Sequence, residues 1–273
     1  MSVTVADINK LRQQTGAGMM DCKKALEESG GDFEKAIEYL RKKGAKIAAN
    51  RQDRDAKEGY VTTKIKDNTK AILLSINCET DFVAKNQDFQ IFAEEISSIA
   101  IEKFPSDAEA LKKLPYNSDI SISDKLMEQI AKIGEKIEIG YYSTLEAPYV
   151  VSYIHPGNRL AVLVGFSKNI DAEAAKNIAM QVAAMAPVSI DKNDVPANIL
   201  ERELDIAREQ VRQEGKPEDM VEKIAQGKLN KFFKESTLLN QEFIKDSKQT
   251  VGQYLQSVDE DAKILSFKRY SLS

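Results

Sequence analysis

The amino-acid sequence predicts an α+β protein with a helical N-terminal unit, two strand-and-helix blocks and an inserted pair of helices. Three observations predict this class. Apolar residues recur at helical spacing through the first 45 residues, strand-like apolar runs follow at about 59–65 and 71–78, and the segment from about 189 to 234 returns to a charged, helical pattern. Because 273 residues exceed the common size of a single domain, we expect two or three domains.

The composition is that of an ordinary globular protein, with 42% hydrophobic and 30% charged residues. A net charge of −4 disfavours a dominant nucleic-acid surface, because phosphate binding needs concentrated positive charge. No apolar run approaches the roughly 18 to 20 residues of a membrane span, and no signal-like leader opens the chain. We therefore expect a cytoplasmic protein with neither a nucleic-acid partner nor a membrane partner.

Few side chains suit metal or nucleotide chemistry. The single histidine, His155, and the two cysteines, Cys22 and Cys78, are too far apart in sequence to match the usual zinc-site spacing. The sequence contains neither a Walker A pattern nor GxGxxG, the glycine-rich loops that hold nucleotide phosphates. We expect free thiols, no metal site and no cofactor.

The first 45 residues predict three short helices. Thr4, with Asp7 three residues later, resembles a capping box in which Asp replaces the usual Glu or Gln. The first helix ends at the turn 15–18, Asp32 caps the third helix, and Gly44 is expected to close it. The predicted apolar faces consist of Val5, Ile8 and Leu11; Met19, Cys22, Ala25 and Leu26; and Phe33, Ala36, Ile37 and Leu40.

The first strand-and-helix block follows a charged segment. Residues 45–58 predict a linker or a solvated helix. The strands at about 59–65 and 71–78 are joined by a polar turn that contains Asp67 and Asn68. The second of these strands is a continuous apolar run, which predicts that it is buried.

The chain leaves this strand through the segment CETDFVAKNQDF, residues 78–89. A helix follows, starting near Ala84 or Asn86. The loop itself leaves two interpretations open. In the first, Phe82 folds back onto the core and Asp81 caps the helix; in the second, the pair is presented outward to a partner.

A second strand-and-helix block follows a helix near 126–134 and a strand at 136–142, while residues 104–123 show no clear pattern. The elements of this block are strands at 148–154 and 160–166 around the turn His155 to Asn158, a helix at 171–185 that Pro187 ends, and near the C-terminus a helix at 250–258 and a strand at 262–270.

The insertion at about 189–234 predicts an antiparallel helical hairpin, with Gly215-Lys216-Pro217 as its turn. The spacing of apolar residues in the first helix is that of a coiled-coil seam. The residues expected to face each other are Leu200, Leu204, Ala207 and Val211 on one helix and Met220, Val221, Ile224, Ala225 and Phe232 on the other.

Four segments resemble one protein family. LRQQTGAGMMDCKKAL at 11–26 and ETDFVAKN at 79–86 are similar to the two signature segments of the elongation factor Ts family. YIHPGNRLAVLV at 153–164 and IAMQVAAMAP at 178–187 resemble the same family in the expected order. Members of this family are guanine-nucleotide exchange factors for elongation factor Tu in bacterial-type translation.

The resemblance implies a domain organisation. Residues 1–52 would form a UBA-like three-helix domain, 53–144 the N-terminal core subdomain, 145–187 with 230–273 the C-terminal core subdomain, and 188–229 a protruding coiled-coil hairpin. Many members continue into a C-terminal helical module that helps to grip the partner. This sequence ends at Ser273 and departs from that pattern, so the resemblance does not carry the grip of that module over to this chain. The family can associate through the C-terminal subdomain, and the residues leave open whether this chain forms a homodimer.

The resemblance also implies a protein that is not an enzyme. A nucleotide exchange factor binds the nucleotide-free state of its partner more tightly than the GDP-bound state, and by linkage it lowers the affinity for GDP. The implied partner is elongation factor Tu in both its GDP-bound and its nucleotide-free states.

The segment Thr80, Asp81, Phe82 and Val83 is implied to disturb the partner's Mg²⁺ site. Phe82 would act as an apolar wedge, and Asp81 would add negative charge close to the metal's coordination shell.

Four further residues are implied as partner contacts. Arg12, Met19 and Met20 would touch a helix of the partner's G domain, and His155 would touch a second face of the partner. The simpler alternatives are that one of the two methionines packs in the core and that His155 is a hydrogen-bonded turn residue.

Two other function classes compete with this one. Cys78 and His155 could form a thiol hydrolase pair. No third orienting residue or oxyanion motif accompanies them, and Cys78 ends an apolar strand where burial is common. An RNA-binding translation protein is disfavoured by the acidic charge balance.

Overall fold

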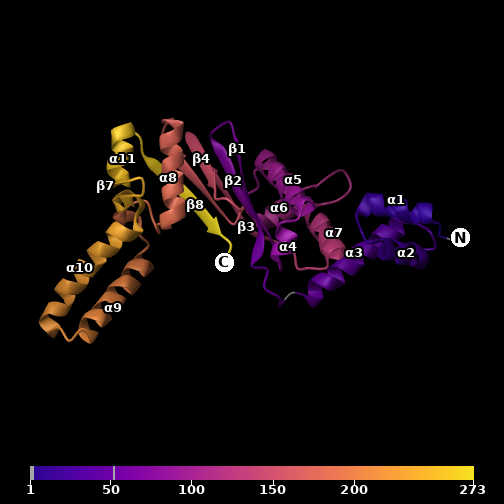
Figure 1. Ribbon diagram of the computed structural model, residues 1–273, viewed down its shortest axis with the longest axis horizontal. Coiled ribbons are helices and arrows are strands. Elements are labelled where there is room, and N and C mark those ends of the chain that lie inside the picture. The colour runs from indigo at the N-terminus through magenta and orange to yellow at the C-terminus, as the bar shows by residue number, and fades with distance from the viewer. Residues whose placement is uncertain (1–2, 52) are drawn as a thin grey trace.

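The computed structural model describes residues 3–51 and 53–273. Figure 1 shows an elongated molecule with a helical bundle at one end, a helical hairpin at the other and two sheets between them. The first half contains α1 (Val5–Thr15), α2 (Met19–Glu28), α3 (Phe33–Asn50), β1 (Glu58–Lys66), β2 (Lys70–Cys78), α4 (Asp81–Ala84), α5 (Gln87–Lys103), α6 (Ala108–Lys113), α7 (Ile122–Ile133) and β3 (Glu138–Glu146). The second half contains β4 (Tyr149–Ile154), β5 (Leu160–Phe166), α8 (Ala172–Met185), η1 (Lys192–Asp194), α9 (Ala197–Gln213), α10 (Glu218–Ser236), η2 (Leu238–Asn240), β6 (Glu242–Phe243), β7 (Asp246–Thr250), α11 (Val251–Val258) and β8 (Ile264–Ser271).

The N-terminal helices form as their caps predict. The Thr4 hydroxyl accepts a hydrogen bond from the Asp7 N–H at 3.2 Å, and the Asp7 carboxylate accepts one from the Thr4 N–H at 3.1 Å, so the predicted capping box is confirmed. α1 ends at Gly16, whose φ of +67° lies in the left-handed region that favours glycine. Two expectations are wrong, because Val5 is 69% exposed and Met19 is 49% exposed, so neither joins the buried apolar faces. The buried residues of the bundle are Ile8, Leu11, Ala17, Cys22, Ala25, Leu26, Ala36 and Leu40.

Gly44 does not end α3, contrary to the sequence-based expectation, and the helix continues to Asn50. The glycine lies where α3 crosses α7. A Cβ added at Gly44 would lie 2.3 Å from the carbonyl oxygen of Met127 and 3.1 Å from the side chain of Ala131. The missing side chain therefore lets the two helix backbones touch, and this contact joins the N-terminal bundle to the core.

Two antiparallel three-stranded sheets pack face to face, with strand orders β1-β2-β3 and β4-β5-β8. Alternate side chains of β2 have different surroundings. Ile72, Leu74 and Ile76 lie in a cluster with α5 and α7, whereas Ala71 and Leu73 lie in a cluster with residues of β4 and β5. Because helices cover its outer face and the second sheet its inner face, β2 is buried throughout, which explains the continuous apolar run.

The second sheet has the same organisation. Val162, Val164 and Phe166 of β5 pack with residues of α8 and α11, whereas Ala161 and Leu163 face the first sheet. The molecule therefore has four layers, helices, sheet, sheet and helices, between its two helical ends (Figure 1).

Most predicted strands and turns are confirmed. Asp67 and Asn68 have φ values of +53° and +55°, as expected for a tight hairpin turn between β1 and β2. The strand predicted at 136–142 lies at Glu138–Glu146. The sequence patterns missed α6 and the short strands β6 and β7, because each is too short to show a period.

The insertion is a pair of packed helices, α9 and α10, that projects from one end of the second sheet (Figure 1). Ion pairs between the two helices join Arg208 to Glu222 at 2.9 Å and Lys228 to Glu214 at 2.8 Å. One expected seam residue is wrong, because Met220 is 43% exposed. The buried residues of the two helices are Ala207, Val211, Val221, Ala225 and Leu229.

Substitution of Gly44 by alanine tests the α3–α7 contact. We expect Gly44→Ala to lower the free energy of unfolding by about 1 to 3 kcal/mol, because the helices must move apart to accommodate the methyl group. Gly227→Ala in α10 is the matched control, since nothing lies within 4 Å of its added Cβ. That control should stabilise the protein by about 0.5 to 1 kcal/mol through the better helix propensity of alanine. Urea denaturation measures both, and equal effects of the two substitutions would contradict the close-contact role.

Candidate functional site

The loop after β2 presents Phe82 to solvent. Thr80 caps α4, a single helical turn, and Asn86 then caps α5. Phe82 projects from α4 with 84% of its side chain exposed, the largest value among the exposed large apolar side chains of the described residues. The interpretation in which Phe82 folds back onto the core is therefore wrong, and its companion is wrong too, because Asp81 caps neither helix.

The four residues of the predicted segment divide into two pairs. Thr80 holds the turn, its hydroxyl accepting from the Val83 N–H at 3.5 Å, and Val83 packs against the core beneath α5. Asp81 lies on the solvent side beside Phe82. A hydrogen bond from Lys85 at 2.6 Å holds the pKa of the Asp81 carboxyl below its ordinary value, so this group is ionised at neutral pH.

A notch of about 300 Å³ lies beside Phe82, between the loop and α7. Phe82, Phe89 and Ile133 are among the residues that line it, and the ion pair of Asp88 with Lys132, at 3.3 Å, lies at the same place. A Cβ added at Gly16 would lie 3.4 Å from Cδ of Lys132. The turn between α1 and α2 is therefore next to the notch, so α7 brings two segments that are far apart in sequence to neighbouring places.

Both methionines at the start of α2 are exposed. Met19 is 49% exposed and Met20 is 72% exposed, so the alternative in which one of them packs in the core is wrong. Arg12, on the last turn of α1, is also exposed. The structure thus places these three residues on the surface of the bundle.

His155 lies at the turn between β4 and β5, separate from the Phe82 loop. Its Nδ1 shares a hydrogen bond with the Tyr153 hydroxyl at 3.0 Å, and the ring is exposed. It borders a depression of about 360 Å³ that includes Met180 and Ile244. The hydrogen bond fits the structural interpretation, and the exposure leaves the ring accessible to a partner.

Cys78 is fully buried, and its Sγ donates a hydrogen bond to the Thr80 carbonyl oxygen at 3.2 Å. Burial, together with the nearby charges of Glu135 and Glu58, raises the pKa of the Cys78 thiol to about 12. A nucleophilic cysteine needs a lowered pKa and access to substrate. This environment argues against the hydrolase that uses Cys78 with His155.

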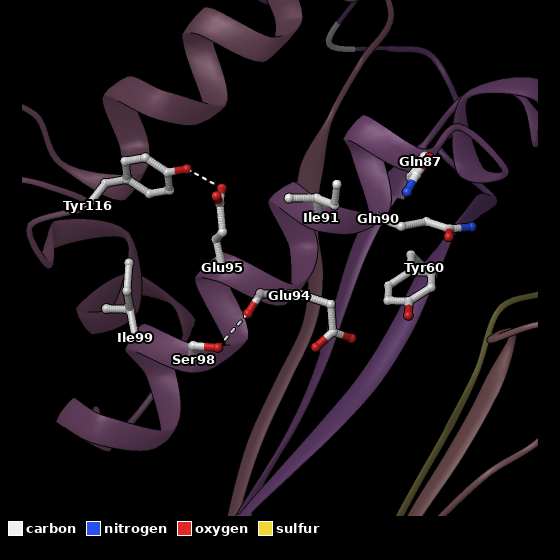
Figure 2. A pocket seen from close by; sticks show the side chains of 9 residues that line it. All are labelled: Tyr60, Gln87, Gln90, Ile91, Glu94, Glu95, Ser98, Ile99 and Tyr116. Carbon is white, nitrogen blue, oxygen red and sulfur yellow. Dashed lines mark hydrogen bonds between the residues drawn. The ribbon is translucent and has the colours of Figure 1, made fainter.

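A depression of about 700 Å³ lies along α5 between Tyr60 and Tyr116 (Figure 2). Its two carboxylates already have partners. Glu94 accepts from Thr62 and pairs with Lys64, each at 2.7 Å, and Glu95 accepts a hydrogen bond from Tyr116. We interpret this depression as a solvated helix face.

The part of the chain that the structure describes, residues 3–51 and 53–273, also bears on metal sites and membrane spans. In that part of the chain, no three His, Cys, Asp or Glu side chains are grouped to hold a metal ion. None of the helices described there combines the length and apolar character that a membrane crossing requires.

Two acidic residues outside the predicted set of site residues, Glu79 and Glu135, anchor the Phe82 loop. The Glu135 carboxylate accepts hydrogen bonds from the backbone N–H groups of Glu79 and Thr80, both at 3.1 Å. The Glu79 carboxylate accepts from the Lys136 N–H at 2.6 Å and from Arg51 at 2.6 Å. Local patterns could not reveal these contacts, because the partners are more than 25 residues apart.

Comparison with known proteins identifies relatives along the whole chain. Residues 79–273 match the family model described as Elongation factor TS. Elongation factor Ts of Christiangramia forsetii is 53% identical over 273 residues, covering 99% of this chain and 98% of the relative. Elongation factor Ts of Flavobacterium psychrophilum is 49% identical, covering 99% of both chains, and that of Porphyromonas gingivalis is 48% identical, covering 100% of this chain and 99% of the relative.

The charge of Glu79 predicts a pH-dependent stability. Burial alone would raise the pKa of Glu79, but hydrogen bonds from the Lys136 N–H, Arg51 and Arg54 outweigh it and hold the pKa below its ordinary value of about 4.5. The unfolded chain therefore takes up the proton first as the pH falls. The stabilisation is present above about pH 4.5 and is lost as the pH falls through the folded-state pKa.

We expect Glu79→Gln to lower the free energy of unfolding by about 1.5 to 3 kcal/mol at pH 7, because it removes hydrogen bonds to a charged group. The difference from the wild type should shrink below the ordinary pKa of about 4.5. Urea denaturation at pH 7 and pH 4 measures it. Glu102→Gln, which breaks an exposed ion pair with Lys66, is the control and should cost under about 1 kcal/mol. A pH-independent difference for Glu79→Gln would contradict the assignment.

Proposed function

This chain belongs to the elongation factor Ts family, and we propose that it promotes GDP release from elongation factor Tu by disturbing the partner's Mg²⁺ and phosphate site. The family acts in translation elongation as the nucleotide exchange factor of elongation factor Tu. The observation that carries the proposal is Phe82, an aromatic ring that is 84% exposed on a loop held by hydrogen bonds at its base. A large apolar ring exposed on a loop between rigid elements is available for contact with another molecule.

The proposed activity is differential binding and needs no covalent chemistry. A protein that binds the nucleotide-free partner more tightly than the GDP-bound partner weakens GDP binding by the same factor. To change the ratio of nucleotide-free to GDP-bound partner from about 1:99 to 99:1, the protein must bind the nucleotide-free state more tightly by roughly 5.5 kcal/mol. The contacts must therefore be stronger when GDP and Mg²⁺ have left.

Phe82 supplies one part of this preference. Burying a phenylalanine side chain stabilises a complex by about 1.5 to 3 kcal/mol. If the ring enters between elements that support the Mg²⁺ site, this gain is available only when those elements have moved apart, so it favours the nucleotide-free state.

Asp81 supplies a charge next to that ring. Its carboxylate is ionised and pairs with Lys85, which is itself exposed. An exposed ion pair is weak, so the carboxylate can exchange Lys85 for groups of the partner at little cost. A negative charge placed near the Mg²⁺ ligands of the partner changes the electrostatic field at the ion and so disturbs its coordination shell.

The bundle and the second sheet supply further proposed contacts. Arg12, Met19 and Met20 would bind a helix of the partner's G domain, and their exposure is consistent with that role. His155 would contact a second face of elongation factor Tu. Because GDP must still be bound at first contact, we propose that the protein recognises both the GDP-bound and the nucleotide-free states in the cytoplasm. Association of two copies through the C-terminal subdomain stays a prediction.

Replacement of Phe82 by alanine tests the wedge. We expect Phe82→Ala to keep the fold and to slow catalysed GDP release about ten- to a hundredfold, because the variant loses the burial energy of the ring. Release of a fluorescent GDP analogue from elongation factor Tu, followed in a stopped-flow instrument, measures the rate.

Leu265→Ala provides the matched control, since Leu265 is an apolar side chain of β8 that is 50% exposed outside the proposed site. With this variant, elongation factor Tu should release GDP as fast as it does with the wild-type protein. A wild-type rate for Phe82→Ala would exclude the wedge, and no acceleration by the wild-type protein would exclude the proposed function altogether.

A further inference from the structure

We propose that Glu135 is a positioning residue for nucleotide exchange, which holds the Phe82 loop in its binding conformation before the partner arrives. This inference rests on the proposed function and extends it to a residue outside the loop. Glu135 follows Gly134, which ends α7 with a φ of +80° and turns the chain toward the loop. Figure 1 shows α4 close to the end of α7.

The Glu135 carboxylate accepts three hydrogen bonds from the base of the loop. Two come from the backbone N–H groups of Glu79 and Thr80, both at 3.1 Å, and the third comes from the Thr80 hydroxyl at 2.7 Å. All three donors lie immediately before Asp81 and Phe82. A single side chain therefore fixes the point from which the exposed turn starts.

Glu79 in turn accepts a hydrogen bond from the segment that carries Glu135. Its carboxylate accepts from the Lys136 N–H at 2.6 Å, so the backbone of each segment donates to the side chain of the other. Arg51 and Arg54 neutralise Glu79 from the segment that follows α3, at 2.6 Å and 3.2 Å. With a side-chain exposure of only 12%, Glu79 is well shielded from competing water.

The loop benefits from such an anchor because Val83 and Ala84 hold only its far side against the core, and the helical turn itself is very short. α4 has only four residues, far below the roughly 12 that an isolated helix requires in water. The exposed Phe82 ring contributes no packing that would hold the turn. If the loop were mobile, binding would have to order it, and each ordered residue costs about 1 to 2 kcal/mol of backbone entropy.

The chemistry of Glu135 suits this task. All three partners are donors, and an ionised carboxylate is an acceptor with two oxygens and no proton to clash with them. Glutamine has nearly the same shape, but its one oxygen would serve the two backbone N–H groups as a neutral acceptor, and its NH₂ group would face the Thr80 hydroxyl, which must then accept instead of donate. Glu135→Gln therefore weakens the anchor by replacing a charged acceptor with a neutral one, at a minimal change of volume.

The first experiment measures exchange as a function of the concentration of this protein. We expect Glu135→Gln to raise the concentration for half-maximal GDP release about tenfold, with a much smaller effect on the rate at saturation, because binding itself can order the loop. Glu146→Gln, at the far end of β3 and paired with Lys70, is the matched control and should match the wild type. An unchanged half-maximal concentration for Glu135→Gln would overturn the proposal.

A double-mutant cycle with Phe82→Ala separates positioning from a general loss of structure. If Glu135 acts by holding Phe82, Glu135→Gln should cost little further exchange activity once the ring is absent. Equal losses in the two backgrounds would show an independent effect and would overturn the positioning role. Glu135→Asp keeps the charge with a shorter reach, should give an intermediate loss, and replaces Glu135→Gln if that variant does not fold.

Hydrogen exchange in the protein without its partner provides a readout that does not depend on activity. The amides of Glu79 and Thr80 should be protected in the wild type and should exchange at least tenfold faster in Glu135→Gln. Unchanged protection would overturn the proposal even if the kinetics changed. If the wild-type protein failed to accelerate GDP release, the proposed function would fall, whereas this measurement would still decide whether Glu135 holds the loop.

Discussion

The strand β2 has no face toward water, and the position of the Phe82 loop depends on this constraint. Its side chains alternate between the helices on one face and the second sheet on the other, so the strand is buried from Ala71 to Cys78. Both faces of the sheet are already covered by packed side chains at the point where the strand ends. The chain can continue only outward, and the first residues after Cys78 must satisfy their backbone polar groups at the edge of the core.

Glu79 and Glu135 meet that requirement by exchanging hydrogen bonds at the strand exit. A half-buried carboxylate loses part of its hydration and needs donors for its oxygens, and here two carboxylates receive backbone N–H groups, a hydroxyl and two guanidinium groups. The same hydrogen bonds tie the base of the loop to the segment that follows α7. An exposed aromatic ring on a rigid base binds a partner at a lower entropy cost than the same ring on a mobile loop.

The helix α7 connects this loop to the N-terminal bundle. It packs on α3 at Gly44, pairs Glu128 with Arg41, and carries Lys132 next to the turn at Gly16. The turn that precedes the exposed methionines of α2 and the loop that carries Phe82 thus both lie next to α7. In the proposed exchange by differential binding, this arrangement would hold the contacts at a fixed spacing, which favours one shape of the partner over another.

The sequence by itself determined the class of the fold, most of the helices and strands, and the family, because these follow from local periodicity, capping and turn residues, and contiguous motifs. It predicted the turn at Asp67 and Asn68 and the capping box at Thr4 for the same reason. The local patterns left open whether Phe82 faces solvent and whether Met19 or Met20 packs in the core; the family resemblance implied that all three are accessible, and the structure shows them exposed. Only the tertiary structure decided that Gly44 is a close helix contact rather than a helix end. It alone brought Glu135 to Thr80. Each of these depends on which surfaces are already covered by residues distant in the chain, and no local pattern carries that information.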